Sequence, residues 1–348
     1  MELHEVREAT VRTELAAEPV QRQVRTSPWL TVPKRALSGV HKVIGPSKHK
    51  ANAGCCTWLN AVYWIRVMDK RPNGDLLIEN LHDVGKIKVK HVQAVIESDL
   101  VYPLLRGRDV QRWHAEPSAH IIVANRSDKL AGIPEPEMKR RYPKTFAYLK
   151  QFEGDAKKPV RGTLRGRSGY RQYFKPSDPF YSIYNIGPYS MTDWKVVWRE
   201  QSSFFQAAFV GPESGRAVLP DHKLMMVACS SQQEADFILA MLNSRPSLLA
   251  IHSYVISTST STHVLENIAV PRLEKRNNDH AALAKFARQC HAAAAKGDAE
   301  AVAFLETEID ITAAKIWGIT DDELSAIRDA LAELGLARAE TADEIADE

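Results

Sequence analysis

Two arginines on either side of a glycine, Arg106-Gly107-Arg108, are the first group in the sequence whose residue types suggest a ligand. A planar guanidinium group pairs well with phosphate oxygens and with the edge of guanine. Glycine lets the backbone come close to a bound molecule. The alternative is an ordinary turn in which the arginines pair with Asp109 and Glu97. Taken alone, these residues favour that alternative.

A cluster of cations between residues 157 and 175 is the second such group. Three glycines keep the segment flexible, and the rings of Tyr170, Tyr173 and Phe174 are interleaved with the charges. Mobile cations displace counterions from a DNA backbone, and rings can stack or wedge between bases. A disordered surface loop has the same composition and is the alternative. The cations, with no acidic residue among them, are Lys157, Lys158, Arg161, Arg165, Arg167, Arg171 and Lys175.

Hydroxyl and amide side chains provide two further candidate contacts. Six consecutive serines and threonines, Ser257 to Thr262, precede His263. Hydroxyls and backbone amides can bind phosphates, although a flexible linker has the same composition. Tyr184 and Asn185 are candidates for contacting a base, because a ring can stack and an amide can pair with adenine.

Composition excludes several classes of protein. The chain has 348 residues, 44% hydrophobic and 26% charged, which is ordinary for a globular protein of one or two domains. A net charge of +3 indicates little about partners. The absence of a long apolar run and of a signal-peptide pattern predicts a cytoplasmic protein with no membrane partner. Four cysteines without a Cys-x-x-Cys pair indicate neither a disulfide scaffold nor a zinc site.

The remaining pattern predicts strands followed by helices. Asn73-Gly74 indicates a hairpin turn, and the alternating lysines of 86–90 indicate an edge strand. Residues 1–35 read as a linker or lead-in with one short helix near Glu5–Ala17. Further helices are expected at 138–152, 231–243, 279–296, 300–317 and 322–336, with capping boxes at Ser231 and Thr320.

Several segments together resemble the target-recognition region of N6-adenine DNA methyltransferases of restriction-modification systems, the TaqI-like and type IIG enzymes. Two positions depart from the family pattern, because Trp58 and Ala61 stand where the family usually has glycine. This departure affects the conformation of the turn and any DNA contact from Asn60. The matching segments, in family order, are 56–67, 102–110, 142–149, 184–189, 195–199, 220–225, 242–246, 261–268 and 310–323.

The resemblance implies an α+β fold, with a mixed twisted sheet, flanking helices and a helical C-terminal part. It divides the chain into a lead-in (1–35), a DNA target-recognition domain (36–275) and a helical segment (276–348). The implied partner is double-stranded DNA, and the match on both sides of the basic cluster favours a DNA-facing loop. The expected DNA-binding residues are Arg106, Arg108, Arg161, Arg165, Arg167, Tyr170, Arg171, Lys175, Tyr184, Asn185, Ser259, Thr260, Thr262 and His263.

Two motifs of the catalytic part of the family are missing. The sequence has no Asn/Asp-Pro-Pro-aromatic tetrapeptide to hold a flipped adenine, and no glycine-rich turn for a cofactor. We therefore expect no catalytic residue and no cofactor in this chain. S-adenosylmethionine is expected on a methyltransferase domain or subunit, with this chain a separate subunit or a C-terminal piece of a larger enzyme.

Two alternatives to a recognition module remain. One is a divergent metal-dependent DNA endonuclease that uses the acids and lysines of Pro220-Asp-His-Lys223 and Glu153-Gly-Asp-Ala-Lys157. The other is an inactive remnant of a type IIG enzyme.

Overall fold

A computed structural model describes residues 14–21, 23–24, 26–126, 131–255 and 259–336. Helices are combined with antiparallel and mixed sheets, so the predicted α+β class is confirmed. The chain forms two compact units. The described residues of unit 1 fall in Met1–Lys50, Gln201–Gln206 and Asp236–Glu340, and those of unit 2 fall in Ala51–Glu200 and Ala207–Ala235. Each unit thus combines segments that are far apart in the sequence, whereas the predicted domains were continuous.

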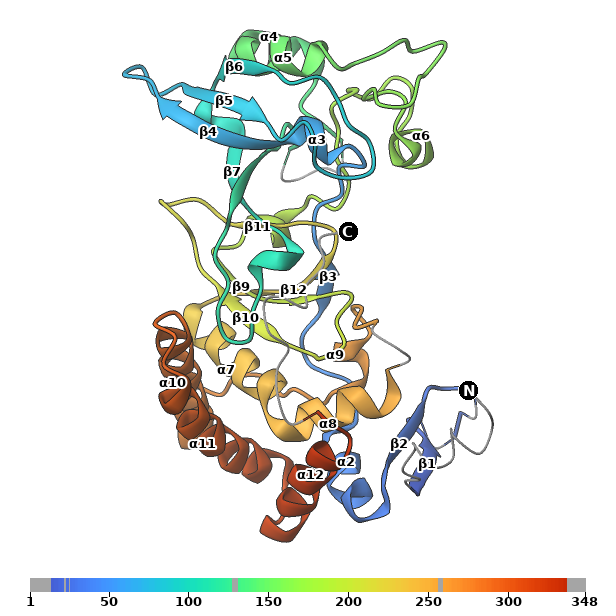
Figure 1. Cartoon of the computed structure of the whole chain (residues 1–348), viewed down its shortest axis with the longest axis vertical. Coiled ribbons are helices and arrows are strands. Elements are labelled where there is room, and N and C mark those ends of the chain that lie inside the picture. Colours follow the sequence, from blue (N-terminus) through green and yellow to red (C-terminus); the bar gives the residue numbers. More distant parts are fainter. Residues whose placement is uncertain (1–13, 22, 25, 127–130, 256–258, 337–348) are drawn as a thin grey trace, which may run out of the picture. The chain divides into compact units, whose positions relative to one another are not determined.

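Unit 2 contains a six-stranded sheet of order β11-β7-β8-β4-β5-β6 (Figure 1). All neighbours are antiparallel except β11 and β7, which are parallel. The predicted hairpin joins β4 to β5: Gly74 has a φ of 88°, and the Arg71 amide donates to the Asp75 carbonyl at 2.8 Å. The strands are β4 (Trp64–Lys70), β5 (Leu76–Asn80), β6 (Gln93–Ile96), β7 (Val101–Leu105), β8 (Ala119–Ile122) and β11 (Leu219–Pro220).

Two predictions in this region are wrong. The expected helix 138–152 is two helices, α4 (Glu135–Arg141) and α5 (Pro143–Lys150), because Pro143 pushes Tyr142 out of helical geometry to a φ of −133°. The lysines of 86–90 are not in a strand. Asn80 at the end of β5 instead anchors this connection by donating to the Lys90 carbonyl at 3.0 Å.

The large core of unit 2 lies between this sheet and its helices. It combines sheet residues such as Ile65 and Ile121 with Leu149 from α5 and with Phe180 and Tyr181 from a later loop. The Tyr148 hydroxyl donates to the Val62 carbonyl at 2.6 Å, which ties α5 to α3 (Asn60–Tyr63). Phe180 and Tyr181 follow the basic cluster in the sequence, so their burial in this core anchors the C-terminal end of the loop that contains the cluster.

A second sheet of unit 2 has the order β10-β9-β12-β3 and is antiparallel throughout. Its small core includes Val197, Leu224 and Met226. Its strands are β3 (Ala51–Ala53), β9 (Trp194–Arg199), β10 (Ala207–Val210) and β12 (Leu224–Cys229). The short elements of unit 2 are α6 (Ser168–Tyr173), η2 (Ser98–Leu100), η3 (Gly107–Asp109) and η4 (Pro188–Met191).

Unit 1 is mainly helical, with one antiparallel pair of strands, β1 (Leu15–Pro19) and β2 (Trp29–Pro33). The predicted short helix near Glu5–Ala17 is wrong for its described end, which is in β1; residues 1–13 lie outside the described residues. The other elements are η1 (Lys34–Ala36), α2 (Leu37–Val43), most of α7 (Gln232–Asn243), α8 (Arg245–Tyr254), α9 (Val264–Asn267), α10 (Asn278–Ala294), α11 (Ala299–Trp317) and α12 (Asp321–Glu333).

The last three helices confirm their sequence predictions because their end signals are local. Asn277 caps α10, Gly318 ends α11 with a φ of 67°, and Thr320 forms the predicted capping box of α12. Buried Asp310 binds the Arg245 amide at 2.8 Å and its guanidinium at 2.5 Å, which joins α11 to α8. Within the described residues, no helix is long and apolar enough to cross a membrane.

Candidate nucleic-acid interface

The polar groups of the arginine–glycine turn, residues 106–109, are hydrogen-bonded within the turn and to Ser118. Arg106 is 7% exposed, and its Nε donates to Ser118 Oγ at 3.1 Å. The Arg106 backbone amide donates to the Asp109 carboxylate at 2.8 Å, and the Ser118 hydroxyl donates to the other carboxylate oxygen at 2.5 Å. The guanidinium of Arg106 therefore stabilises the turn. We correct its predicted role as a base-reading residue.

Arg108 differs from Arg106 in exposure. Its side chain is 45% exposed and lies 4.0 Å from the Asp109 carboxylate. The expected partner Glu97 binds elsewhere, because its carboxylate accepts hydrogen bonds from the Thr145 amide at 2.8 Å and the Thr145 hydroxyl at 2.7 Å. Of the two arginines in this turn, Arg108 is the one accessible to a ligand.

Arg167 in the basic cluster has a structural role that its sequence context did not indicate. It is 3% exposed, and its guanidinium donates to four carbonyl groups at 2.7 to 3.0 Å. Burial lowers its pKa, while the neighbouring Tyr63 and Tyr170 oppose that shift. We correct the predicted DNA contact at Arg167. The acceptors are the carbonyls of Thr57, Leu164, Phe180 and Ser182.

Arg165 and Tyr170 are also engaged within the protein. Arg165 donates from Nε and Nη2 to Glu153 Oε1 at 2.9 and 2.8 Å. Partial burial raises the pKa of Glu153, but hydrogen bonds from Lys150 and Arg165 hold it below its ordinary value. Tyr170 is 4% exposed and donates to the Asp178 carbonyl at 2.6 Å. Both predicted DNA contacts are corrected to residues that hold the loop together.

Five cations of the same cluster remain exposed. None of their side chains has a hydrogen-bond or ion-pair partner among the described residues, and we call them the exposed cations. Two of them flank the end of α6, which lies beyond the loop that follows α5 in Figure 1. Unpaired surface charge of one sign is suited to a phosphate backbone. The exposed cations are Lys157, Lys158, Arg161, Arg171 and Lys175.

Three aromatic rings lie side by side in the same unit, and we call them the aromatic cluster: Trp58, Tyr173 and Tyr184. The ring centroids of Tyr173 and Tyr184 are 4.4 Å apart, and those of Trp58 and Tyr173 are 5.6 Å apart. The sequence predicted a base contact at Tyr184 and grouped Tyr173 with the rings of the basic cluster that can stack on bases, but it assigned no role to Trp58. The signal was available for Trp58, because it occupies a glycine position of the family pattern.

The positions next to this cluster also contain predicted residues. Asn185 follows Tyr184 with a positive φ of 57°, and its side-chain amide has no hydrogen-bond partner among the described residues. Asn60 is occupied, since its Oδ1 accepts from the Thr57 hydroxyl at 2.5 Å. The contact between the rings of Tyr173 and Tyr184 places Tyr184 and Asn185 at the end of α6, where Arg171 and Lys175 lie.

The hydroxyl-rich segment belongs to unit 1, and residues 256–258 lie outside the described residues. Ser259 is exposed, and Thr262 is half-buried. Thr260 is 1% exposed, which corrects its predicted phosphate contact. His263 is exposed and hydrogen-bonds through Nδ1 to Glu266 at 2.6 Å.

The residues of the nuclease alternative do not form a metal site in the described part of the chain. Asp221 is 4% exposed, and burial raises its pKa to about 7. Glu153 is paired with Arg165 and Lys150. No group of three or more His, Cys, Asp or Glu suited to a metal ion occurs among the described residues.

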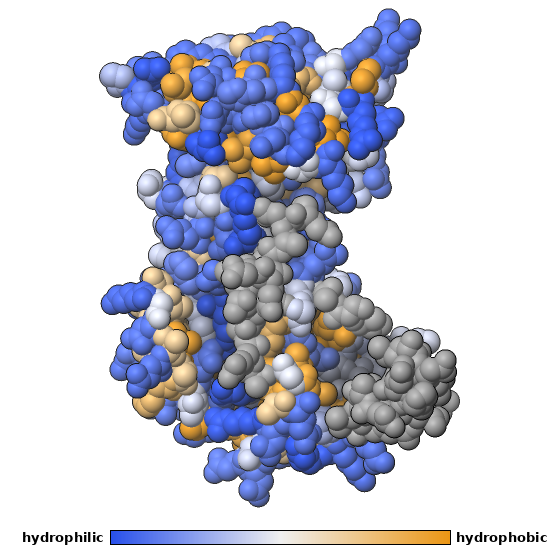
Figure 2. Space-filling view, viewed as in Figure 1, coloured by the Kyte–Doolittle hydropathy of each residue, from blue (hydrophilic) through white to orange (hydrophobic). Residues whose placement is uncertain are grey.

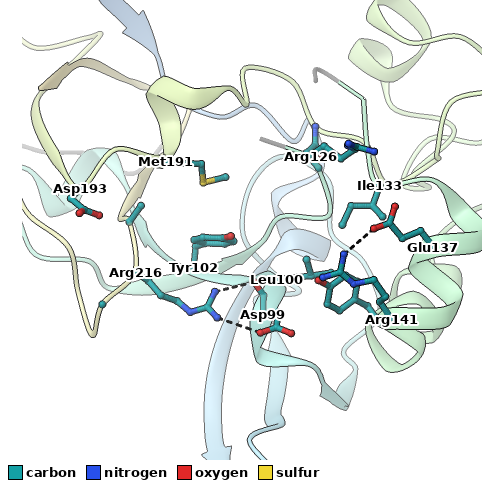
Figure 3. Close-up of a pocket in the computed structure, with 14 residues that line it drawn as sticks. Asp99, Leu100, Tyr102, Arg126, Ile133, Glu137, Arg141, Met191, Asp193 and Arg216 are labelled. Atoms are coloured by element: carbon teal, nitrogen blue, oxygen red, sulfur yellow. Dashed lines mark hydrogen bonds and ion pairs between the residues drawn. The ribbon is translucent and has the colours of Figure 1, made fainter. Parts of the chain in front are cut away.

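A cavity of about 760 Å³ lies elsewhere in unit 2 and is lined by Tyr102, Arg141 and Arg216 among others (Figure 3). Two of its arginines bind protein acceptors. Arg216 donates to the carbonyls of Asp99 at 2.9 Å and of Val101 at 3.0 Å, and Arg141 donates to Glu137 at 2.9 Å. The part of Figure 2 that covers the six-stranded sheet and α4 to α6 is mostly hydrophilic, with separate hydrophobic patches between the hydrophilic regions.

Comparison with known proteins gives one match in sequence. The chain is 22% identical over 149 residues to the type II methyltransferase M.NspV of a Nostoc species, which covers 43% of this chain and 28% of that protein. No family model matches the chain.

Two solved structures are similar in part. One is the type IIL restriction-modification enzyme MmeI in complex with DNA, with a TM-score of 0.46 and 10% identity, covering 82% of this chain and 35% of that chain. The other is the type IIG restriction endonuclease BpuSI, with a TM-score of 0.32 and 12% identity, covering 75% and 31%. Both TM-scores are below 0.5, so neither establishes a shared fold. The chain is similar in sequence to a type II methyltransferase and spans well under half of the proteins it matches.

Proposed function

We propose that this chain is the DNA target-recognition part of an adenine-N6 DNA methyltransferase or restriction-modification enzyme, in which another domain or subunit transfers the methyl group. The observation that carries the proposal is the set of exposed cations on the basic loop, of which Arg171 and Lys175 lie at the end of α6, next to three partly exposed rings. Cations supply affinity for the phosphate backbone, and rings and amides supply contacts to bases. The similarity to a type II methyltransferase is consistent with this role.

The division of labour within unit 2 supports the proposal. Arg167 and Arg165 hold the loop by binding protein acceptors, so the loop has a defined conformation rather than a random one. Arg161, Arg171 and Lys175 on that loop are left for a ligand. A pre-ordered cationic loop loses less conformational entropy on binding than a disordered one. Arg108, Tyr184 and Asn185 are the residues that we propose to approach bases.

The test is a selection from randomised DNA duplexes with the purified full-length chain, followed by sequencing of the bound fraction. We expect enrichment of one short sequence, with at least about a thousandfold preference over random duplex at physiological salt. A bound fraction with the same base composition as the input, both alone and with a candidate methyltransferase partner, would contradict a recognition function. Methyl transfer from S-adenosylmethionine by this chain in isolation would contradict the proposed division of labour.

A further inference from the structure

The aromatic cluster stands outside both hydrophobic cores of unit 2. Trp58, Tyr173 and Tyr184 are absent from the two sets of residues that form those cores. Trp58 and Tyr184 are half-buried, and Tyr173 is 45% exposed. Large apolar rings usually contribute to stability by complete burial. These rings are arranged against one another, but they keep part of their surface accessible.

The backbone at Trp58 is held in a conformation that disfavours a large side chain. Trp58 has a φ of 55°, in the left-handed region that glycine adopts easily. Such a conformation costs a non-glycine residue about 1 kcal/mol or more. The turn at Trp58 therefore has a backbone conformation typical of glycine, although the residue there is a tryptophan.

The helix that faces the Trp58 ring, α6, has a glycine at the point of contact. A Cβ atom placed on Gly169 in α6 would lie 1.9 Å from the Trp58 ring, so only glycine leaves room for the indole at this position. The backbone at Trp58 is thus strained in the conformation that holds the ring, and Gly169 in α6 has no side chain that would collide with the ring. Packing of the core does not explain this pair of features, because Trp58 is not a core residue.

The surroundings offer contacts to the base and to the phosphate of a nucleotide. The rings offer faces for stacking on a base, and the unpartnered amide of Asn185 offers a donor and an acceptor for a base edge. Arg171 in α6 and Lys175 just after this helix are exposed and can reach a phosphate. Within a regular duplex, each base is covered on both faces by its neighbours, so a protein ring reaches a face only where stacking is interrupted.

We propose that the aromatic cluster binds a nucleobase that has left the regular stack of a DNA duplex. The inference rests on the proposed DNA-binding function and names the chemical state of the DNA that unit 2 prefers. Stacking on rings tolerates any base, so this preference is independent of the recognised sequence.

The experiment uses the full-length chain and two duplexes of identical flanking sequence, each with the fluorescent adenine analogue 2-aminopurine. In one duplex the analogue is an unpaired single-nucleotide bulge, and in the other it is paired with thymine. We expect about tenfold tighter binding of the bulged duplex. We also expect a change in 2-aminopurine fluorescence on binding that reports stacking.

Single substitutions show whether an aromatic ring stacks on the displaced base or only adds to the affinity for DNA in general. Tyr173→Ala is expected to bring the ratio of the two affinities close to one, and Tyr173→Phe is expected to retain it. Phe304→Ala removes a ring that is 66% exposed in unit 1 and should leave both affinities unchanged. Trp58→Gly suits the local backbone, so it should fold and also reduce the ratio.

The outcomes distinguish failure of this inference from failure of the proposed function. If the chain binds both duplexes equally, or if Tyr173→Ala leaves the ratio unchanged, the inference is wrong and the DNA-binding function stands. If neither duplex is bound above the level of an uncharged polymer control, the proposed function is itself contradicted, and the inference falls with it.

Discussion

The arginine–glycine turn and the basic loop have similar compositions, yet their cations serve different purposes. In the turn, Arg106, Asp109 and Ser118 form a closed group of hydrogen bonds. In the loop, five cations extend from the protein without a partner among the described residues. The difference arises from the acceptors nearby rather than from the arginines. A cation whose side chain is enclosed by carboxylate or carbonyl oxygens stabilises the fold, whereas a cation that keeps much of its side chain exposed is available to a ligand.

The same difference occurs inside the basic loop. Arg167 is enclosed by carbonyl oxygens of distant segments, whereas Arg161 and Arg171 remain exposed. Exchanging residues between these two classes therefore tests the comparison directly, with effects on stability for one class and on DNA affinity for the other.

The largest expected effect is the loss of stability in Arg167→Leu. The substitution leaves four buried carbonyl groups without their donor, and we expect it to lower the free energy of unfolding by about 3 to 5 kcal/mol. Urea denaturation followed by tryptophan fluorescence measures the loss. Arg161→Leu is the matched control at an exposed position and should change stability by about 0.5 kcal/mol or less. Equal effects of the two substitutions would show that the two classes of arginine do not differ.

The next effect concerns Asp221, which lies near the arginine–glycine turn. Burial raises its pKa from 3.8 to about 7, and the charge of Asp109 adds to this shift, while the Lys223 amide opposes it. The folded protein therefore binds a proton that the unfolded chain releases, and stability falls as the pH rises from about 4 to about 7. Asp221→Asn should remove this decline.

We expect Asp221→Asn to be more stable than the wild type by about 2 kcal/mol at pH 8, and to have no such advantage near pH 4. Unfolding by urea at both pH values measures the difference. Comparison with the wild type at each pH cancels the opposite trend of His252, whose pKa burial lowers to about 4. Parallel pH profiles of the two proteins would rule out a raised pKa at Asp221.

A smaller contrast is expected within the turn. Arg106→Ala removes hydrogen bonds to Ser118 and the charge beside Asp109, and we expect a loss of about 1 to 2 kcal/mol in the free energy of unfolding. Arg108→Ala should cost about 0.5 kcal/mol or less, because its side chain is 45% exposed, compared with 9% for the side chain of Arg106. In DNA binding the order should reverse, with Arg108→Ala weakening binding in a folded protein. A loss of stability as large for Arg108→Ala would be inconsistent with this structure.

Local signals predicted much of the fold. The hairpin at Asn73-Gly74 and the capping box at Thr320 depend on residues within a few positions of each other, and both were found. The edge strand predicted from the alternating lysines of 86–90 is wrong, because alternation produces a strand only where a neighbouring strand is free to pair. The site was harder to predict, because the acceptors of Arg167 come from Thr57, Phe180 and other distant residues. The sequence shows Trp58 at a position where the family that it resembles usually has glycine. The proposed stacking role of Trp58 depends on its contact with Gly169, which only the structure shows.

The salt dependence of DNA affinity tests the central claim most directly. We compare the wild type with the triple variant Lys157→Glu, Arg161→Glu, Arg171→Glu, and with Lys296→Glu, which reverses an exposed charge in unit 1. If the exposed cations bind phosphates, the triple variant should bind at least about tenfold more weakly and show a flatter slope of log affinity against log salt, by roughly one unit for each phosphate that is no longer neutralised. Lys296→Glu should keep the wild-type slope. A triple variant that folds and retains both the affinity and the slope of the wild type would contradict the assignment of this surface to DNA.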